Sequence, residues 1–485
     1  MIGHRHRLLA LLTFFLTSPL FAQAILTQPR YTSYDDAHAI VEALADDLPP
    51  ELKGKSPAEI KADWASWVAR RDAGIRQRLI QGDEDSLINL LLFGTSFTSR
   101  PRITGSDLTL LARLATQKGI RGSLALTSSK LDEILNARIN DLINGLTSPG
   151  NNERLLFARQ VLVAKKIYRT ASLIGRNQIK DYLLTSLDRV LSEQTSYLKA
   201  LEDARLLNNP GEEFYERSRL YRARGLSLDT SLLPDFAIEE AMKAIRAKGL
   251  LKEGSVRNVG IVGPGLDFTD KQEGYDFYPQ QSIQPFAVID TLLRLGLSSL
   301  GNLRVETLDL SPRVNDHLSH ANQLSQRGKE YVVQLPRNLQ ARWKDDAVRY
   351  WEHFGDQIGV STSPVVIPAD VSDVKVRAVR IKPLVVSRIK PIDLNIILQR
   401  MELPPPDRFD LIIATNILVY YDVFEQSLAM ANLEKMLRPG GFLLSNNALP
   451  EFPFLPLHAV GFLSVAYSDR PNDGDHIVWY ERKAE

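Results

Sequence analysis

From about residue 254 onward, short apolar runs alternate with segments of helical periodicity, and this alternation constrains the fold more than any other feature. Strands that alternate with helices pair in parallel, because each helix returns the chain to the same edge of the sheet. The runs typical of strands are 259–262, 305–310, 376–381, 384–389 and 411–414, and helical segments such as 282–295, 312–326 and 423–437 separate most of them. We therefore predict an α/β fold with a doubly wound, mainly parallel sheet.

The first half of the chain has helical periodicity over most of its length. A helix is predicted to begin at Ser56-Pro57, because serine is a preferred N-cap and proline suits the first turn, and to end at Gly82. Since 485 residues are too many for one ordinary core, two domains are expected. We predict an all-helical domain over residues 25–245, followed by the α/β domain over residues 250–485.

The first 24 residues have the pattern of a signal peptide. Arg5 and Arg7 precede an apolar run over residues 8–21, and Ala22-Gln23-Ala24 supplies the small residues of a cleavage site. The alternative is an ordinary buried first helix. The pattern predicts a protein exported to the periplasm or secreted, if the signal is used. No integral membrane segment is expected after cleavage, because no later run reaches the roughly 20 apolar residues needed.

Charge and cysteine content exclude several classes of partner and site. Lysine and arginine number 59 against 58 aspartates and glutamates, so no overall positive charge favours nucleic acid, and none is expected as a partner. The sequence has no cysteine, which excludes disulfides, thiolate metal sites and cysteine nucleophiles. No metal site is predicted either: His317 and His320 share a predicted helix face, but they lack a third ligand in view.

Three predicted strands end in residues typical of a ligand crevice. Residues 259–262 run into Gly263-Pro264-Gly265, where the missing Cβ atoms let the backbone approach a ligand; a plain turn is the alternative. The next strand ends in Asp309, which can accept hydrogen bonds from a ribose diol or else simply cap a helix. The strand over 411–414 ends in Thr415 and Asn416. Because parallel strands end at the same edge, these residues are expected to meet.

In this order, the motifs resemble those of class I S-adenosylmethionine-dependent methyltransferases. FDLIIATN (409–416) followed by LRPGGFLL (437–444) is similar to the late motifs of that family. The nearest subfamily is the chemotaxis-type protein glutamate O-methyltransferases, whose pattern FDxIxxRNxLxYF matches residues 409–421 except that Thr415 stands where arginine is expected. Residues 283–293, 307–321 and 389–397 also resemble segments of that subfamily. The resemblance covers roughly residues 257–447 and implies a Rossmann-like methyltransferase fold.

The resemblance implies S-adenosylmethionine as the cofactor and gives roles to residues at the strand ends. The residues that would bind the cofactor are Gly263, Gly265 and Asp267 at its methionine end, Asp309 at the ribose, Leu394 and Asn395 at the adenine, and Thr415 and Asn416 beside the methyl group. Tyr420 would stand near the substrate as the catalytic residue.

Several features leave the chemistry open. Thr415 removes a cation from the cleft, and Ile283-Gln284 stands where the family has an acidic pair. In an inserted loop, Asp276 could orient or deprotonate a nucleophile, or be a solvated loop acid. The segment GTSFTSR, with Thr95 and Arg100, is faintly similar to one that contacts the cofactor in the chemotaxis enzymes.

The pattern therefore predicts a methyltransferase of unknown acceptor, with O-methylation of a carboxylate or hydroxyl favoured. The alternative is an exported binding or scaffold protein on the same fold without catalysis, since S-adenosylmethionine is made in the cytosol. A third interpretation is a nicotinamide-dependent oxidoreductase, although the Gly-Pro-Gly turn lacks the full Gly-x-Gly-x-x-Gly pattern of dinucleotide sites.

Overall fold

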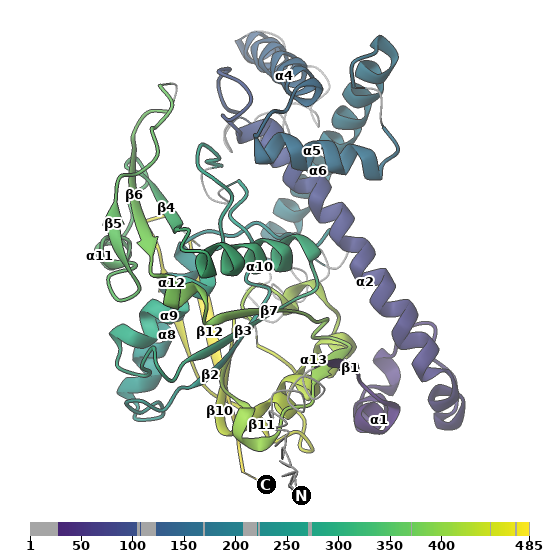
Figure 1. The fold of residues 1–485 in the computed structure, drawn as a ribbon. Helices are drawn as coiled ribbons and strands as arrows, with labels where there is room; N and C mark the ends of the chain where they lie inside the picture. The colour runs from purple at the N-terminus through teal and green to yellow at the C-terminus, as the bar shows by residue number, and fades with distance from the viewer. Residues whose placement is uncertain are drawn as a thin grey trace, which may run out of the picture.

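The structure is a computed structural model in which a central sheet lies beside a long helix that leads to a helical bundle (Figure 1). It describes residues 28–103, 107, 123–167, 170–206, 221, 224–269, 274–369, 371–446, 448–470 and 473–484. The signal peptide predicted over residues 1–24 lies outside the described residues. Within them, none of the helices is both long enough and apolar enough to cross a membrane.

The central sheet has seven strands in the order β11-β12-β10-β9-β2-β3-β7. Its strands are β2 (Asn258–Val262), β3 (Arg304–Asp309), β7 (Ile389–Asp393), β9 (Phe409–Ile413), β10 (Leu437–Ser445), β11 (Leu457–Ala466) and β12 (Gly474–Arg482). Neighbours from β10 to β7 are parallel, and β12 is antiparallel to both of its neighbours. From β2 the winding proceeds first toward β7 and then toward β10, which creates a switch point between β2 and β9. The predicted Rossmann-like α/β fold is confirmed.

Two of the expected strands do not join this sheet. Residues 376–381 belong to β6 (Val374–Ile381), which pairs with β4 (Tyr331–Asn338) and β5 (Gly359–Thr362) in a separate antiparallel sheet. Residues 383–386 form the short helix α12 (Pro383–Val386), and β7 begins only at Ile389. An apolar run of this length does not distinguish a central strand from a peripheral strand or a buried helical turn. With α11 (Asp345–His353), the small sheet forms an insertion between β3 and β7.

Helices cover the central sheet. They are α8 (Leu233–Ala247), α9 (Gln284–Arg294), α10 (Pro312–Gln326) and α13 (Val423–Met436). Helix α8 packs against β11, β12 and α9. Although α8 falls within the range predicted for the helical domain, its apolar face, including Phe236, Ala241 and Ile245, is buried in the core of the α/β part. The expected boundary near residue 245 is therefore misplaced, because α8 is a layer of the sheet's own core.

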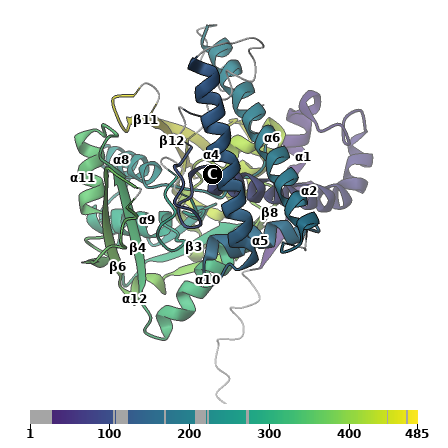
Figure 2. The same ribbon diagram turned by 90° about the horizontal axis from the view of Figure 1, so that it is seen from above.

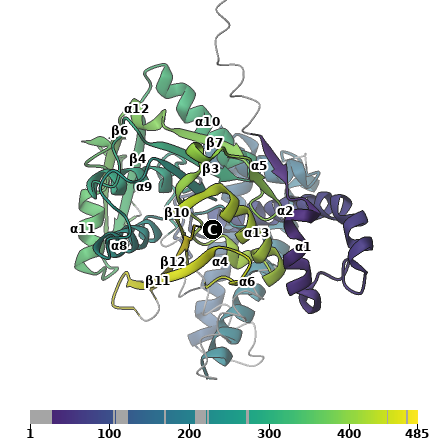
Figure 3. The same ribbon diagram turned by 90° about the horizontal axis from the view of Figure 1, so that it is seen from below.

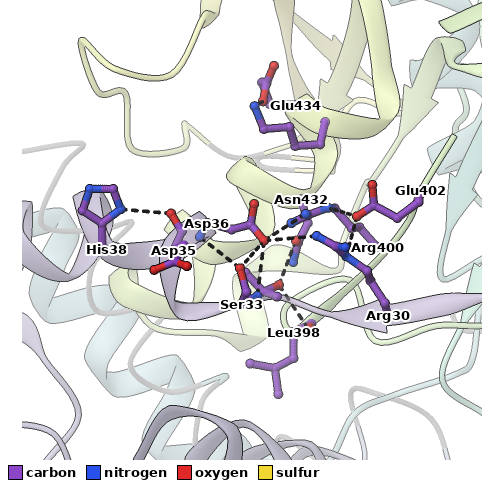
Figure 4. Close-up of polar contacts among 12 residues, drawn as sticks. Arg30, Ser33, Asp35, Asp36, His38, Leu398, Arg400, Glu402, Asn432 and Glu434 are labelled. Carbon is purple, nitrogen blue, oxygen red and sulfur yellow. Dashed lines mark hydrogen bonds and ion pairs between the residues drawn. The ribbon is translucent and has the colours of Figure 1, made fainter. Parts of the chain in front are cut away.

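The N-terminal end of the described chain is also tied to the α/β part. Strand β1 (Pro29–Tyr31) pairs with β8 (Gln399–Met401), so the region before α8 is not all helical. Figure 4 shows Ser33 at the start of α1 (Tyr34–Ala43) and Asp36 receiving a hydrogen bond of 2.9 Å from Arg400. Arg30 pairs with Glu402 at 2.5 Å. A short 3-10 helix, η2 (Ala45–Asp47), follows α1.

Helix α2 (Pro57–Phe93) begins where predicted, with Ser56 as its N-cap, but it continues through Gly82. Glycine often ends a helix, but Gly82 instead lies where another segment of the chain crosses α2. A Cβ atom on Gly82 would lie 1.9 Å from the carbonyl oxygen of Leu226, whose own N–H donates to the carbonyl of Arg78 at 3.1 Å. The glycine thus lets a second backbone segment cross the middle of α2.

The far end of α2 enters a bundle with α4 (Ser123–Thr147), α5 (Glu153–Ala164) and α6 (Leu173–Leu206). This bundle has its own hydrophobic cluster, whereas the first part of α2 shares one continuous core with α1 and the central sheet. The small β4-β6-β5 sheet and α1 lie on opposite sides of the molecule (Figure 2, Figure 3). Trp351 and Phe354 of the insertion are buried in the main core.

Candidate functional site

A cavity of about 890 Å³, including the space at its mouth, opens at the carboxyl ends of β2, β3, β7 and β9. This is the switch point, where ligands of open α/β sheets bind. Residues that the sequence assigned to a ligand come together in its wall: Gly263, Gly265, Asp309, Leu394, Thr415, Asn416 and Tyr420. They follow four different strands and are up to about 160 residues apart, so only the parallel topology unites them.

The glycine turn after β2 has no room for side chains. Gly263 and Gly265 have φ values of +62° and +66°, which favour glycine. A Cβ atom on Gly263 would lie 2.2 Å from Cδ1 of Ile417, and one on Gly265 would lie 2.6 Å from the carbonyl oxygen of Leu228. The turn therefore keeps its backbone close to both opposing walls of the cavity.

Asp309 is buried at the tip of β3, where one carboxylate oxygen accepts a 2.7 Å hydrogen bond from the backbone N–H of Ser311. Burial raises the pKa of this carboxyl group to about 7, and the negative charge of Asp393 acts in the same direction. The bond from Ser311 and the positive charge of Arg313 oppose the rise. Asp309 consequently changes charge near neutral pH.

Polar groups also meet at the end of β9. Gln284, at the start of α9, donates from Nε2 to the hydroxyl of Thr415 at 3.4 Å. Asn416 has a φ of +59°, a strained value for a residue with a side chain. Asn446 stabilises this turn: its Oδ1 accepts from the N–H of Asn416 at 2.8 Å, and its Nδ2 donates to Oδ1 of Asn416. Asn446 was not among the residues predicted from the sequence. It follows β10 directly, so its position at a strand end is the sequence feature that could have identified it.

The outer wall of the cavity comes from a segment that the sequence did not identify, residues 226–231. Its backbone pairs with the residue after the glycine turn: Leu266 donates to Leu228 at 2.8 Å, and Thr230 donates to Leu266 at 3.1 Å. Asp229 in this segment also lines the cavity and accepts from the hydroxyl of Ser86 in α2 at 3.1 Å. No local motif marks these residues, because α2 and the crossing at Gly82 bring them to the site.

Two acids lie in the wall of the cavity. Asp229 and Asp309 line it, and among the described residues of its wall there is no lysine, arginine or histidine. Tyr420 contributes a buried ring that packs edge-to-face on Tyr221, with ring centroids 5.2 Å apart. Beside it, burial raises the pKa of Tyr421 well above its usual range, so this phenol stays neutral.

Two predicted cofactor residues lie outside the cavity wall. Asp267 is fully buried and accepts hydrogen bonds from the hydroxyl of Tyr278 at 3.1 Å and from Nε2 of Gln281 at 2.8 Å. Asn395 donates from Nδ2 to Asp72 of α2 at 2.7 Å. Both side chains bond to neighbouring structural elements, and their roles along the cofactor stay a prediction. Gly265, two residues before Asp267, and Leu394, directly before Asn395, line the cavity instead.

Other residues singled out from the sequence have structural surroundings. Asp276 accepts hydrogen bonds from the N–H and hydroxyl groups of Thr95 and Ser96, at 2.6 to 3.2 Å, so it is neither a free base nor a solvated acid. Arg100 pairs with Asp141 at 3.4 Å. His317 bonds to the hydroxyl of Tyr331 at 2.9 Å. In the described part of the chain, no group of three or more acidic or histidine side chains is placed to hold a metal ion.

No family model and no curated protein match this sequence. Solved structures that resemble it include the N-methyltransferase NodS from Bradyrhizobium japonicum WM9 in complex with S-adenosyl-L-homocysteine, at 15% identity over 56% of this chain and 99% of that chain, with a TM-score of 0.26. Human N-acetylserotonin methyltransferase in complex with SAM is 9% identical over 89% of this chain and 99% of that chain, with a TM-score of 0.23. Because such scores carry no functional argument, we infer function from the cavity.

Proposed function

We propose that this protein is an S-adenosylmethionine-dependent methyltransferase and that its cofactor binds in the cavity at the switch point. The observation that carries the proposal is the convergence of Gly263, Asp309, Leu394 and Asn416 on one cavity wall. The family resemblance assigns each of them to a different part of the same cofactor. Four strand ends supply them, and a chance resemblance would not place all four around one space.

The chemistry of the wall fits the parts of this cofactor. The carboxylate of Asp309 can accept hydrogen bonds from ribose hydroxyls, and the apolar side chains of Leu394 and Ile396 suit the adenine ring. Neutral donors, Thr230 and Ser231, line the same cavity and suit the carboxylate of the methionine part. When bound, the cofactor supplies a methyl group on a positively charged sulfonium.

The negative wall also separates this cofactor from the alternatives. S-adenosylmethionine carries two positive groups and one negative group, so two carboxylates in the wall attract it. The pyrophosphate of a nicotinamide dinucleotide would lie at the glycine turn beside Asp229, and the described residues of the wall supply no cation to balance it. The wall thus favours methyl transfer over hydride transfer.

Methyl transfer asks mainly for alignment and for the exclusion of water, because the sulfonium is already activated. Apolar side chains of Leu79, Leu228 and Ile417 close the sides of the cavity. We assign Tyr420, whose ring is buried in the wall, to the substrate end. These residues hold two reactants together and keep competing water away from the methyl group.

Calorimetric titration of the full-length protein tests the proposal. We expect S-adenosylmethionine and S-adenosylhomocysteine to bind with a Kd on the order of 1–10 μM, and NAD⁺ and ATP to bind about 100-fold more weakly because of their phosphates. If neither sulfur nucleoside binds at about 1 mM, the enzyme proposal fails and a scaffold without cofactor becomes the better account.

A further inference from the structure

Two side chains of α2, Asp72 and Arg76, connect the helix to the sheet beside the cofactor cavity. They are four residues apart on one face of the helix, and Nε of Arg76 donates to the carboxylate of Asp72 at 3.2 Å. Asp72 is buried and Arg76 is half-buried, and neither belongs to the wall of the cavity. Any effect of these two residues on the cofactor therefore passes through the residues that they hold.

Arg76 binds the ends of two strands at once. Its Nη1 donates to the backbone carbonyl oxygen of Leu310, directly after β3, at 3.1 Å. Its Nη2 and Nη1 donate to the two carboxylate oxygens of Asp393, the last residue of β7, at 2.7 and 3.3 Å. A bidentate pair of this kind fixes orientation as well as distance, because the guanidinium group is planar. One side chain of the helix thus sets the spacing of the two strand ends.

The backbone held by Arg76 carries the residues assigned to the adenosine half of the cofactor. Leu310 directly follows Asp309, the proposed ribose acceptor. Asp393 directly precedes Leu394, which lines the cavity where the adenine is expected. The N–H of Leu394 donates to the carbonyl oxygen of Asp309 at 3.1 Å, so a shift of one strand end moves the other.

Asp72 extends this contact by one residue and holds Arg76 in place. One of its carboxylate oxygens accepts from Nδ2 of Asn395, directly after Leu394, at 2.7 Å. The other accepts from the hydroxyl of Tyr31 at 2.8 Å and from Nε of Arg76. Both oxygens are therefore used, and the segment after β7 is fixed to α2 at two successive points.

We propose that Arg76 and Asp72 are positioning residues that keep the adenosine end of the cofactor site in its binding geometry. This inference rests on the proposed function and deepens it. Their side chains bond to residues at the ends of β3 and β7, whereas the methionine half of the cofactor is assigned to the ends of β2 and β9. Arg76 keeps Asp309 and Leu394 at the separation that one nucleoside requires, without contacting the nucleoside.

The pair of Arg76 with Asp393 has an electrostatic consequence that a merely structural contact would lack. The negative charge of Asp393 raises the pKa of Asp309, and Arg76 is the cation bound to Asp393. Removing the cation leaves the charge of Asp393 unbalanced, so the pKa of Asp309 should rise further. The variants below leave the other titratable groups near Asp309 unchanged: Arg313, Asp229 and Tyr421.

Calorimetric titration of the full-length protein with S-adenosylhomocysteine, repeated across pH, tests the proposal. For Arg76→Gln, we expect the Kd at pH 7 to rise about tenfold, and about fivefold of this loss should persist near pH 9 because the strand ends are no longer held. The midpoint of the pH dependence should move up by about half a unit, because Asp309 ionises at higher pH. Arg76→Lys keeps the charge but not the planar fork, so it should lose part of the affinity at an unchanged midpoint.

A second variant moves the midpoint in the opposite direction. Asp393→Asn removes the charge that disfavours ionisation of Asp309, so the midpoint should fall by about half a unit. This result does not require the Arg76 variants to fold. The matched control is Arg71→Gln, which removes another ion pair between α2 and the α/β part, the 2.6 Å pair with Glu425 outside the cavity wall. It should change the Kd by less than about twofold and leave the midpoint in place.

The inference would be overturned if Arg76→Gln lost no more affinity than Arg71→Gln. Midpoints that stay in place, or that move in the same direction in Arg76→Gln and Asp393→Asn, would also overturn it, because they would indicate a structural contact alone. If the natural protein does not bind S-adenosylhomocysteine at about 1 mM, the proposed function itself is refuted.

Discussion

Two cavities lie on either side of Leu79 in α2, and they differ in charge more than in size. The first is the cavity at the switch point, with Asp229 and Asp309 in its wall. The second, of about 1260 Å³, lies between α2, α5 and the start of α10, and its wall holds both acids and bases. There, Arg313 pairs with Asp83 at 3.4 Å and lies 4.2 Å from the centre of the Phe157 ring.

The comparison teaches that the charged residues of the wall distinguish the proposed ligand site from the second cavity. In the second cavity, burial and the nearby charges of His320 and Arg313 lower the pKa of His317 to about 4, so this ring is neutral at pH 7. Arg313 and Asp83 in its wall pair with each other. Among the described residues of the first cavity's wall there are two acids, Asp229 and Asp309, and no basic residue. The four predictions below test this difference, beginning with the largest effect.

Replacing Asp309 with alanine should cause the largest loss of ligand affinity. Two hydrogen bonds from ribose hydroxyls to a carboxylate contribute about 3 kcal/mol or more together, so the Kd of S-adenosylhomocysteine should rise about 100-fold or more. Asp83→Ala removes an acid from the second cavity and should change this Kd less than about twofold. Equal losses in both variants, measured by calorimetry, would show that the two cavities are not distinct in function.

Gly263→Ala should weaken S-adenosylhomocysteine binding about tenfold, because the added methyl group forces Ile417 to move in the cavity wall. The matched control is Gly54→Ala. Gly54 also has a positive φ, +79°, but a Cβ atom there would meet nothing within 4 Å. Both variants should lose about 1–2 kcal/mol of unfolding free energy, because a side chain at a positive φ strains the backbone. Only Gly263→Ala should also bind S-adenosylhomocysteine more weakly. Chemical denaturation measures the loss of stability, and binding assays measure the affinity. If the two variants bound S-adenosylhomocysteine equally tightly, the glycine turn would not belong to the site.

Binding should depend on pH through Asp309. Ribose hydroxyls donate hydrogen bonds, so the ionised carboxylate is the binding form. Because its pKa in the free protein is about 7, affinity should be about tenfold lower near pH 6 than near pH 8, and nearly constant above pH 8. The Asp309→Asn variant should show weak binding without this slope. A slope of opposite sign in the natural protein would mean that protonated Asp309 is the binding form.

Arg313→Gln should have the smallest effect and should act at a distance. Arg313 lines the second cavity, yet its charge holds the pKa of Asp309 lower than burial alone would set it. Without that charge, less of Asp309 is ionised near pH 7, so affinity should fall about twofold to threefold there and recover near pH 8.5. A loss that persists at the higher pH would place Arg313 in contact with the ligand.

The local sequence pattern was sufficient to predict the part of the site that lies at the strand ends. Gly263, Asp309 and Thr415 each follow an apolar run directly, and the end of a parallel strand has a fixed place in the fold. Their convergence could be predicted without knowing any contact. The same reasoning did not predict the hydrogen bonds of Asp267 and Asn395 to neighbouring elements, because strand-end position does not determine which way the next side chain points.

The outer wall of the cavity, residues 226–231, depends on contacts between distant segments that no local sequence pattern reveals. Asp229 reaches the cavity only because its segment crosses α2 at Gly82, a glycine that the sequence pattern indicated as a helix end. From the sequence, Asp276 could act on a nucleophile or be a solvated loop acid, and its hydrogen bonds with Thr95 and Ser96 are evident only in the structure. Helix α8 was assigned to the wrong domain because an amphipathic pattern shows that a face is buried, not what buries it.

A crystal structure of the protein grown with S-adenosylhomocysteine tests the central claim most directly. The account predicts the nucleoside in the first cavity, with its ribose hydroxyls within about 3 Å of the Asp309 carboxylate and its amino-acid part along Gly263 and Gly265. A nucleoside bound against Arg313 in the second cavity, or a first cavity that stays filled by water at saturating ligand, would contradict it.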